Sequence, residues 1–191
     1  MLYNKKNDKN GGRAMIFTLR DWRRSDVESL AENADNPKLA QKLRDVFPSP
    51  YTKKDAEFFI NVCKESISED QITKAIDVSG EAVGCIGLTF GKDVYRKSAE
   101  LGFWLGEDYW GNGIMTAAVK ELSGWAFQNR DIVRIYAEVF EGNFASEKVL
   151  LKAGFFKEAI HRKAVVKDGV LLDSQMFALL KEEYDKLEKD K

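Results

Sequence analysis

The 191-residue sequence has a single histidine and only two cysteines, so few side chains are available to bind a metal ion. Structural zinc sites need about four closely spaced cysteine or histidine ligands. Cys63 and Cys85 lack that spacing, and each lies in an apolar pattern. We therefore expect no metal site, and we interpret both cysteines as reduced core residues of a cytoplasmic protein.

Neither sign of charge is in excess, and long apolar runs are absent. The chain has 30 Lys and Arg residues against 31 Asp and Glu residues, a formal net charge of −1. Such a balance gives no general electrostatic field for nucleic acid or for an anionic membrane surface. The longest nearly apolar run, residues 82–90, is far shorter than the roughly 20 residues of a membrane-spanning helix. We expect neither nucleic-acid nor membrane partners.

The first 14 residues contain few apolar side chains and consist largely of Lys, Asn, Asp and Gly. They lack the apolar segment of a secretory signal. We expect them to form a disordered leader, followed by one domain at residues 15–191. Met1 and Met15 both stay open as the natural start.

The remaining sequence shows the apolar periods of alternating strands and helices. The order predicts a mixed α/β domain with a mostly antiparallel central sheet flanked by helices, and not a doubly wound sheet. The expected elements are a strand at 15–19, helices opening at the capping patterns Ser25–Glu28 and Thr52–Asp55, a hairpin at 72–78 and 81–90, a strand at 98–105, a helix ending near Asn129, a strand at 132–140, a helix between Asn143 and Gly154, a hairpin at 155–166 and 170–180, and a charged helical tail.

A glycine turn, Trp110-Gly-Asn-Gly113, stands between a predicted strand and a predicted helix. Glycines let a backbone approach a ligand closely, and the free N–H groups at a helix start favour a phosphate. No Gly-Lys-Ser/Thr follows, and the third glycine of a dinucleotide motif is absent, so neither of those loops is present. The turn alone is equally compatible with a tight connector.

A second segment follows about thirty residues later: Asn143-Phe-Ala-Ser146, continuing to Ala-Gly154-Phe155. Together the two segments resemble the GNAT superfamily of acetyl-CoA-dependent N-acetyltransferases, over roughly residues 15–181. Trp-Gly-x-Gly and Asn-x-x-Ser are most similar to the subgroup that acetylates the N-termini of ribosomal proteins. The resemblance implies the GNAT acyl-CoA N-acyltransferase fold, acetyl-CoA as cosubstrate, and no metal.

The resemblance also implies which residues contact the cosubstrate. The glycine turn would hold the pyrophosphate, Asn143 would bond the pantetheine arm as well as cap its helix, and a strand splayed by a bulge would offer backbone groups. Trp110 replaces the usual Gln or Arg and Met115 the usual Gly or Ala, with little expected loss because the bonds come mainly from the backbone. The implied contact residues are Phe103, Leu105, Trp110, Gly111, Asn112, Gly113, Ile114, Met115, Thr116, Asn143 and Ser146.

Catalysis by such an enzyme needs a base, because an alkylamine has a pKa of about 10 and is protonated at pH 7. We expect Glu100 to be this base, with Glu138, Asp173 or a water chain as rivals. Many superfamily members carry a tyrosine as general acid where this chain has Leu150. Ser146, one helical turn earlier, is the natural replacement and would stabilise the leaving thiolate.

The sequence defines the acceptor of the acetyl group less well than it defines the cosubstrate. Phe47, Tyr51 and Trp104 are either core aromatics or walls of the acceptor pocket. The resemblance implies a primary amine, which would be the α-amine of a protein or peptide, or a small molecule such as a polyamine, amino acid or antibiotic. The missing tyrosine also keeps a non-catalytic acetyl-CoA-binding module open. We expect a monomer or a homodimer.

Overall fold

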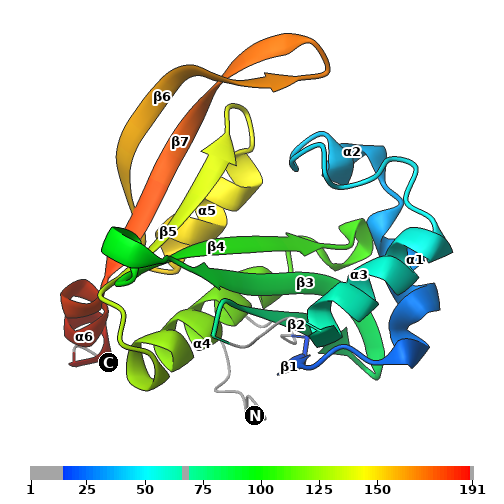
Figure 1. The fold of residues 1–191 in the computed structure, drawn as a ribbon, viewed down its shortest axis with the longest axis horizontal. Helices are drawn as coiled ribbons and strands as arrows, with labels where there is room; N and C mark the ends of the chain where they lie inside the picture. The colour runs from blue at the N-terminus through cyan, green and yellow to red at the C-terminus, as the bar shows by residue number, and fades with distance from the viewer. Residues whose placement is uncertain (1–14, 66–68, 190–191) are drawn as a thin grey trace.

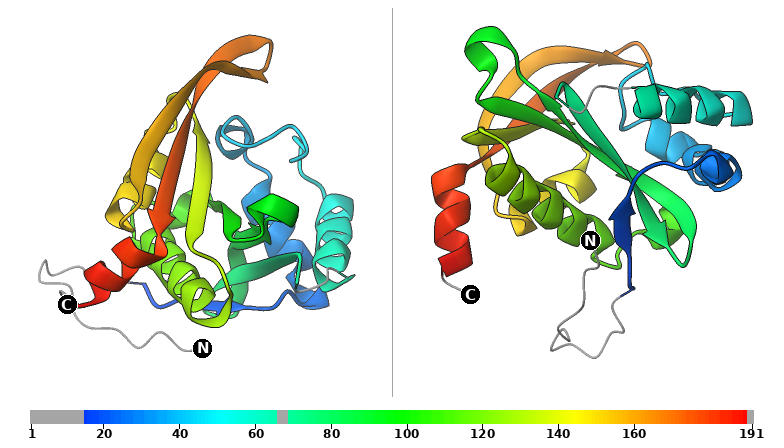
Figure 2. Two further views of the ribbon diagram at one scale, coloured as in Figure 1. Left: turned by 60° about the vertical axis from the view of Figure 1, so that its left-hand side comes forward. Right: turned by 60° about the horizontal axis from the view of Figure 1, so that its bottom comes forward.

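One twisted sheet organises the protein (Figures 1 and 2). The structure is a computed structural model that describes residues 15–65 and 69–189, so the expected leader at 1–14 lies outside the described residues. Within them, the strand order is β1-β2-β3-β4-β5-β7-β6, and every neighbouring pair is antiparallel except β4 and β5. The strands are β1 Thr18–Arg20, β2 Gln71–Val78, β3 Glu81–Phe90, β4 Ser98–Leu105, β5 Arg134–Phe140, β6 Phe156–Lys167 and β7 Val170–Leu180.

Helices cover both faces of this sheet, which confirms the expected fold class. One core packs α1 and α3 against the sheet, and the other packs α4 and α5 against the opposite face. The helices are α1 Val27–Ala34, α2 Pro37–Ala40, α3 Lys53–Glu65, α4 Ile114–Asn129, α5 Phe144–Lys152 and α6 Lys181–Lys189, with 3₁₀ turns at Arg24–Asp26, Asp93–Tyr95 and Glu107–Tyr109. In the described part of the chain, no helix has both the length and the apolar character needed to cross a membrane.

The alternation predicted for β4 is present and decides what each side chain faces. Leu101 and Leu105 lie in the core beneath α4, whereas Trp104 lies in the core beneath α1 and α3. The pairing with β3 runs without a register shift from Gly84 opposite Leu105 to Phe90 opposite Ala99. β4 therefore has one face in the α4 core and the other toward α1 and α3.

Most predicted helix boundaries are confirmed. Thr52 and Asp55 form the expected capping pair, with the Thr52 N–H donating to Asp55 Oδ2 at 2.8 Å. Gly154 follows α5 with a φ of +97°, a left-handed conformation that favours glycine. The short helix α2 was not expected; Asn36 caps it by accepting the Lys38 N–H.

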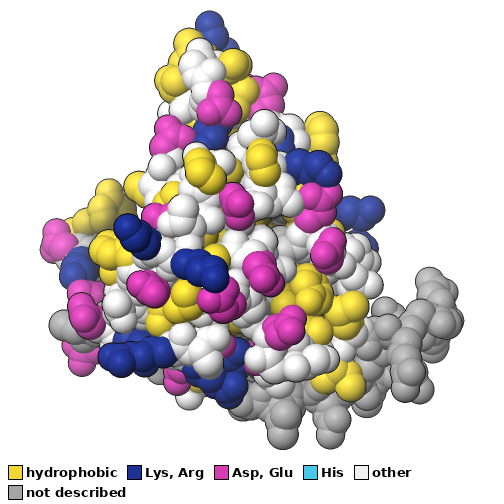
Figure 3. Space-filling view, turned by 90° about the vertical axis from the view of Figure 1, so that its right-hand side faces the viewer, with side chains coloured by type: hydrophobic (Ala, Val, Ile, Leu, Met, Phe, Trp, Pro, Cys, Tyr) yellow, Lys and Arg dark blue, Asp and Glu magenta, His cyan; other side chains and the backbone are white. Residues whose placement is uncertain are grey.

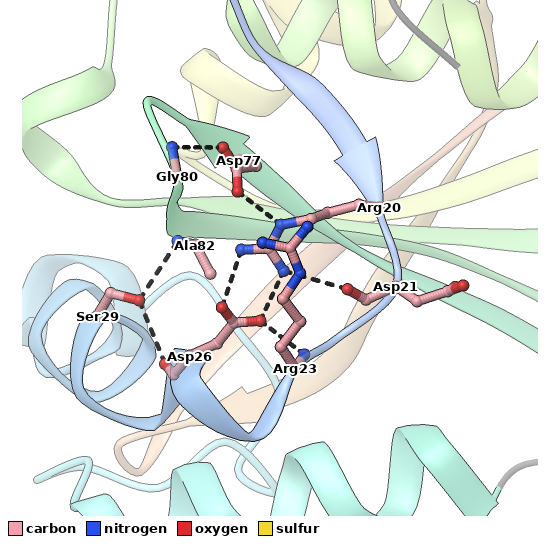
Figure 4. Close-up of polar contacts among 8 residues, drawn as sticks. All are labelled: Arg20, Asp21, Arg23, Asp26, Ser29, Asp77, Gly80 and Ala82. Carbon is pink, nitrogen blue, oxygen red and sulfur yellow. Dashed lines mark hydrogen bonds and ion pairs between the residues drawn. The ribbon is translucent and has the colours of Figure 1, made fainter.

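Arg20 joins β1 to two neighbouring elements through a half-buried cluster of charges (Figure 4). Its guanidinium donates to both carboxylate oxygens of Asp26, at 2.7 and 2.9 Å, and its Nε donates to Asp77 Oδ2 at 2.6 Å. The Asp26 side chain is only 3% exposed. A carboxylate this buried needs a cation and further donors, so the cluster fixes where α1 starts.

The prediction that Ser25 caps α1 with Glu28 is wrong for that reason. Asp26 is the residue before α1, and its Oδ2 also accepts the Arg23 N–H at 2.8 Å. Glu28 instead pairs with Lys53 on α3. The buried pair with Arg20 outweighs the local capping preference of a serine.

Charges of both signs are interspersed on the face shown in Figure 3, which carries α1 and α3. This agrees with the near-neutral net charge. No single-signed surface of the kind that binds nucleic acid is visible on that face.

Candidate active site

The site begins where β4 and β5 separate. The two strands pair only from Ser98 opposite Arg134 to Glu100 opposite Tyr136. Beyond this point β4 stays with β3, while β5 continues beside β7 as far as Phe140. The expected bulge in β4 is absent from its register with β3, so the wedge arises from the divergence of the two strands.

Backbone groups of β4 point into this wedge. The Gly106 N–H bonds the Val83 carbonyl at 2.8 Å, and because bonding residues alternate along an antiparallel pair, Phe103 and Leu105 direct their backbone groups away from β3. The Leu105 carbonyl accepts the Trp110 indole N–H at 2.6 Å. The Phe103 N–H and carbonyl and the Leu105 N–H therefore face the open wedge.

The glycine turn lies at the end of β4 and leads into α4. Gly111 and Gly113 have φ values of +77° and +76°, and a Cβ placed on either would meet nothing within 4 Å. Gly113 is the residue before α4 and has no side chain with which to cap it. The N–H groups of the first helical turn are thus available to a ligand from an open side.

The polar side-chain groups of this turn form hydrogen bonds within the protein. The Trp110 indole is bound to Leu105, and Asn112 Nδ2 donates to the carbonyls of Tyr109 and Trp110 at 3.2 and 3.1 Å. Ile114 and Met115 are buried in the core, and Thr116 is half-buried. The side-chain N–H groups of Trp110 and Asn112 are therefore engaged within the protein, and the groups that this turn offers to a ligand are those of its backbone.

A cavity of about 360 Å³ occupies the wedge between β4, β5, the start of α5 and the segment that joins α2 to α3. Most of the residues that the sequence predicts for acceptor binding and catalysis line this cavity. Those that line it are Phe47, Glu100, Phe103, Trp104, Glu138, Asn143 and Ser146. Tyr51, Leu105, Asp173 and residues 110–116 do not line it.

The start of α5 lines this cavity through Asn143 and Ser146. Asn143 Oδ1 accepts the Ser146 N–H at 3.2 Å, and its Nδ2 has no partner among the residues that the structure describes. Ser146 is the third residue of α5, so its hydroxyl lies near the positive end of the helix dipole. Leu150 is fully buried, so its side chain contributes to packing.

Two of the three candidate carboxylates meet at the cavity. Glu100 forms an ion pair with Arg44, whose guanidinium also lies 3.8 Å from Glu138 Oε2. Glu138 Oε1 accepts the Ser174 hydroxyl at 2.5 Å and lies 3.8 Å from Nδ1 of His161. Sequence reasoning did not find Arg44, Ser174 or His161 as neighbours of the site. The Arg44–Glu100, Ser174–Glu138 and His161–Glu138 contacts join positions 56, 36 and 23 residues apart, and no local pattern marks them.

Asp173, the third candidate, is occupied elsewhere. Its Oδ1 accepts the Lys163 N–H at 2.8 Å within the β6–β7 hairpin. The structure therefore separates Asp173 from the two carboxylates at the cavity and gives it a role in shaping the hairpin.

The three candidate aromatics form one cluster, but only two of them line the cavity. The Phe47 ring lies 5.0 Å from the Tyr51 ring and 5.9 Å from the Trp104 ring. Tyr51 is 6% exposed, and burial raises the pKa of its hydroxyl well above its usual value. Phe47 and Trp104 form a cavity wall, which Tyr51 supports from behind.

Residues 17–156 match the family model described as an acetyltransferase (GNAT) domain. The chain is 29% identical to the uncharacterized N-acetyltransferase p20 of Bacillus licheniformis, over 88% of this chain and 94% of that protein. It is 28% identical to the putative ribosomal N-acetyltransferase YdaF of Bacillus subtilis, over 80% and 76% of the two chains. The structure of Mycobacterium smegmatis RimJ in complex with CoA-disulfide superposes with a TM-score of 0.81, at 22% identity over 93% and 90% of the chains, which shows a shared fold.

Proposed function

Because this chain belongs to the GNAT family and is an N-acetyltransferase, we propose that it transfers the acetyl group of acetyl-CoA to a primary amine held in the cavity between β4 and β5. The observation that carries the proposal is the wedge itself. It places unpaired backbone groups of β4 beside two carboxylates at the cavity, and β4 leads on to the open glycine turn before α4. We also propose that residues 15–191 act as one cytoplasmic domain, as a monomer or homodimer.

The described residues fit acetyl-CoA along this wedge. The turn from Gly111 to Gly113 and the first N–H groups of α4 would bind the pyrophosphate, since they are open and lack a capping side chain. The backbone of Phe103 and Leu105 would bond the amide groups of the pantetheine arm. The free Nδ2 of Asn143 would add a donor from the opposite wall.

Removal of a proton from the acceptor falls to a carboxylate at the cavity. Glu100 and Glu138 both line it, and a water chain to either is the remaining alternative. Once the amine has a lone pair it attacks the thioester carbon, and a backbone N–H of β4 would hold the oxyanion. The Ser146 hydroxyl would then donate to the sulfur as the carbon–sulfur bond breaks, supported by the α5 dipole.

For the acceptor we propose the α-amine of a protein or peptide, which is supported by the similarity to YdaF, a putative ribosomal N-acetyltransferase. A small-molecule amine is the second candidate, because the cavity of about 360 Å³ and its two carboxylates suit a compact cation. A non-catalytic binding module has no support in the relatives, which are named N-acetyltransferases.

A screen that measures release of free thiol from acetyl-CoA tests both parts. The panel pairs peptides that have a free α-amine with the same peptides blocked at that amine, and adds polyamines and amino acids. We expect release with the free peptides and only background hydrolysis with the blocked ones. Release with small amines alone would replace the peptide acceptor, and background rates across the panel would contradict amine acetylation.

A further inference from the structure

We propose that the guanidinium of Arg44 occupies the place that the protonated acceptor amine takes, so that Arg44 must leave before the acceptor binds. This inference rests on the proposed function and assigns Arg44 as a residue that determines acceptor specificity. Its basis is the position of one cation between two carboxylates from different strands.

The geometry around Arg44 is that of a cation site. Its Nη2 donates to Glu100 Oε1 and lies 3.8 Å from Glu138 Oε2. The two carboxylates line the cavity, with side chains 30% and 26% exposed. Two anions this close favour a cation between them. An alkylamine at pH 7 carries the same charge as Arg44 and has three N–H donors for the same oxygens.

The Arg44 side chain can leave this position at little cost in free energy. Its side chain is 60% exposed, and ion pairs with that exposure are weak. The segment around it is held on both sides: Lys42 Nζ contacts the Gly142 carbonyl at 3.4 Å, and Asp45 pairs with Lys167 Nζ at 2.6 Å. In Figure 1 the β6–β7 hairpin arches toward this segment. The side chain of Arg44 can therefore swing out while its backbone stays in place.

This arrangement selects for a cationic acceptor. While Arg44 is in place, its guanidinium occupies the Glu100 oxygen that an incoming ammonium would bond. An incoming ammonium restores the charge pairing that departure of Arg44 removes. A neutral alcohol does not restore it, so an alcohol of the same shape should bind less well than the amine.

The direct test measures amine binding without turnover. Isothermal titration of the CoA complex uses two probes, spermidine and trialanine amide, and no acetyl group is available to transfer. We expect Arg44→Gln to bind at least one probe about two- to fivefold more tightly than the parent, the change produced by removing an exposed ion pair that competes with the ligand. Arg44→Lys keeps the competing cation and should stay within twofold of the parent.

Arg134→Gln is the matched control, because Arg134 forms an Arg–Glu pair with Glu158 and does not line the cavity. It removes the same charge and should leave probe affinity unchanged. The tighter binding of Arg44→Gln should vanish when Glu100→Gln and Glu138→Gln are added. Methylguanidinium should compete with the probes in Arg44→Gln at concentrations that have no effect on the parent.

The outcomes separate this inference from the proposed function. Equal or weaker probe binding by Arg44→Gln, or no probe binding by either protein, would overturn the role of Arg44. Tighter binding together with background thiol release across the amine panel would leave the cation site standing and contradict acetyl transfer.

Discussion

Gly113→Ala isolates the contribution of the glycine turn to acetyl-CoA binding, and the chain provides its own control. Gly113 and Gly169 share a φ of +76°, and in both a Cβ would meet nothing within 4 Å. An alanine in this conformation costs about 1–2 kcal/mol. Both variants should therefore lose the same stability, although Gly169 lies in the turn between β6 and β7, away from the proposed ligand site.

The two variants should differ when ligand is added. Acetyl-CoA at 100 times its Kd stabilises a protein by about 2.7 kcal/mol. For a chain of this size that is a rise in Tm of about 5–11 °C, which we expect for the parent and for Gly169→Ala. In Gly113→Ala the added methyl group points to the open side where the pyrophosphate is proposed to lie. A tenfold weaker Kd would reduce the stabilisation to about 1.4 kcal/mol, or about 3–6 °C.

Thermal unfolding with and without acetyl-CoA measures both effects in one experiment. Gly113→Asp extends the series, since a carboxylate beside the pyrophosphate should abolish the ligand-induced rise in Tm. An undiminished rise in folded Gly113→Ala and Gly113→Asp proteins would refute the assignment of this turn as the phosphate site. Equal loss of the rise in Gly169→Ala would show that the effect is not local.

Three further experiments test other parts of the structure. Ser146→Ala should lower kcat about 10- to 100-fold, or about 1.4–2.7 kcal/mol, and should weaken the Kd for acetyl-CoA by less; equal rates in a thiol-release assay would remove its role at the leaving sulfur. Asp26→Asn should cost about 3 kcal/mol in urea unfolding because Arg20 loses a buried partner, whereas Glu28→Gln should leave the urea midpoint nearly unchanged. Burial raises the pKa of the Cys63 thiol to about 12. Ellman's reagent at pH 8 should therefore label Cys63 at least about 100-fold more slowly in native protein than in urea, and labelling of the native protein should become faster as the pH rises. Comparable labelling rates in native protein and in urea would contradict its burial.

Local periodicity was sufficient to predict most of the elements. The alternation in 98–105, the Thr52–Asp55 pair and the glycine after α5 each depend on neighbours within a few residues, and the structure contains all three. Ser25 failed as a cap because Asp26 is bound by Arg20 on β1, a contact between elements that a local pattern does not encode.

The same distinction between local and long-range contacts applies to the candidate site. The cosubstrate residues lie in two contiguous motifs, so a resemblance could place them. The acceptor side is assembled from residues far apart in sequence, and only the fold brings Arg44 to Glu100 or separates Asp173 from Glu138. Tyr51 and Phe47 lie in an irregular segment without a period, so the sequence offered no means to assign one to the core and the other to the cavity.

The unbroken pairing of β4 restricts how this protein can change in length. One residue inserted between positions 98 and 105 would turn every following side chain to the opposite face of the sheet. Trp104 would then move from the acceptor wall into the α4 core, and Leu105 would move toward the cavity. An insertion at the turn between β6 and β7 lies outside the paired residues, which begin at Lys167 opposite Val170, and can leave the faces of both strands unchanged. Variants that gain or lose residues should therefore be recovered from the hairpin turn and not from β4.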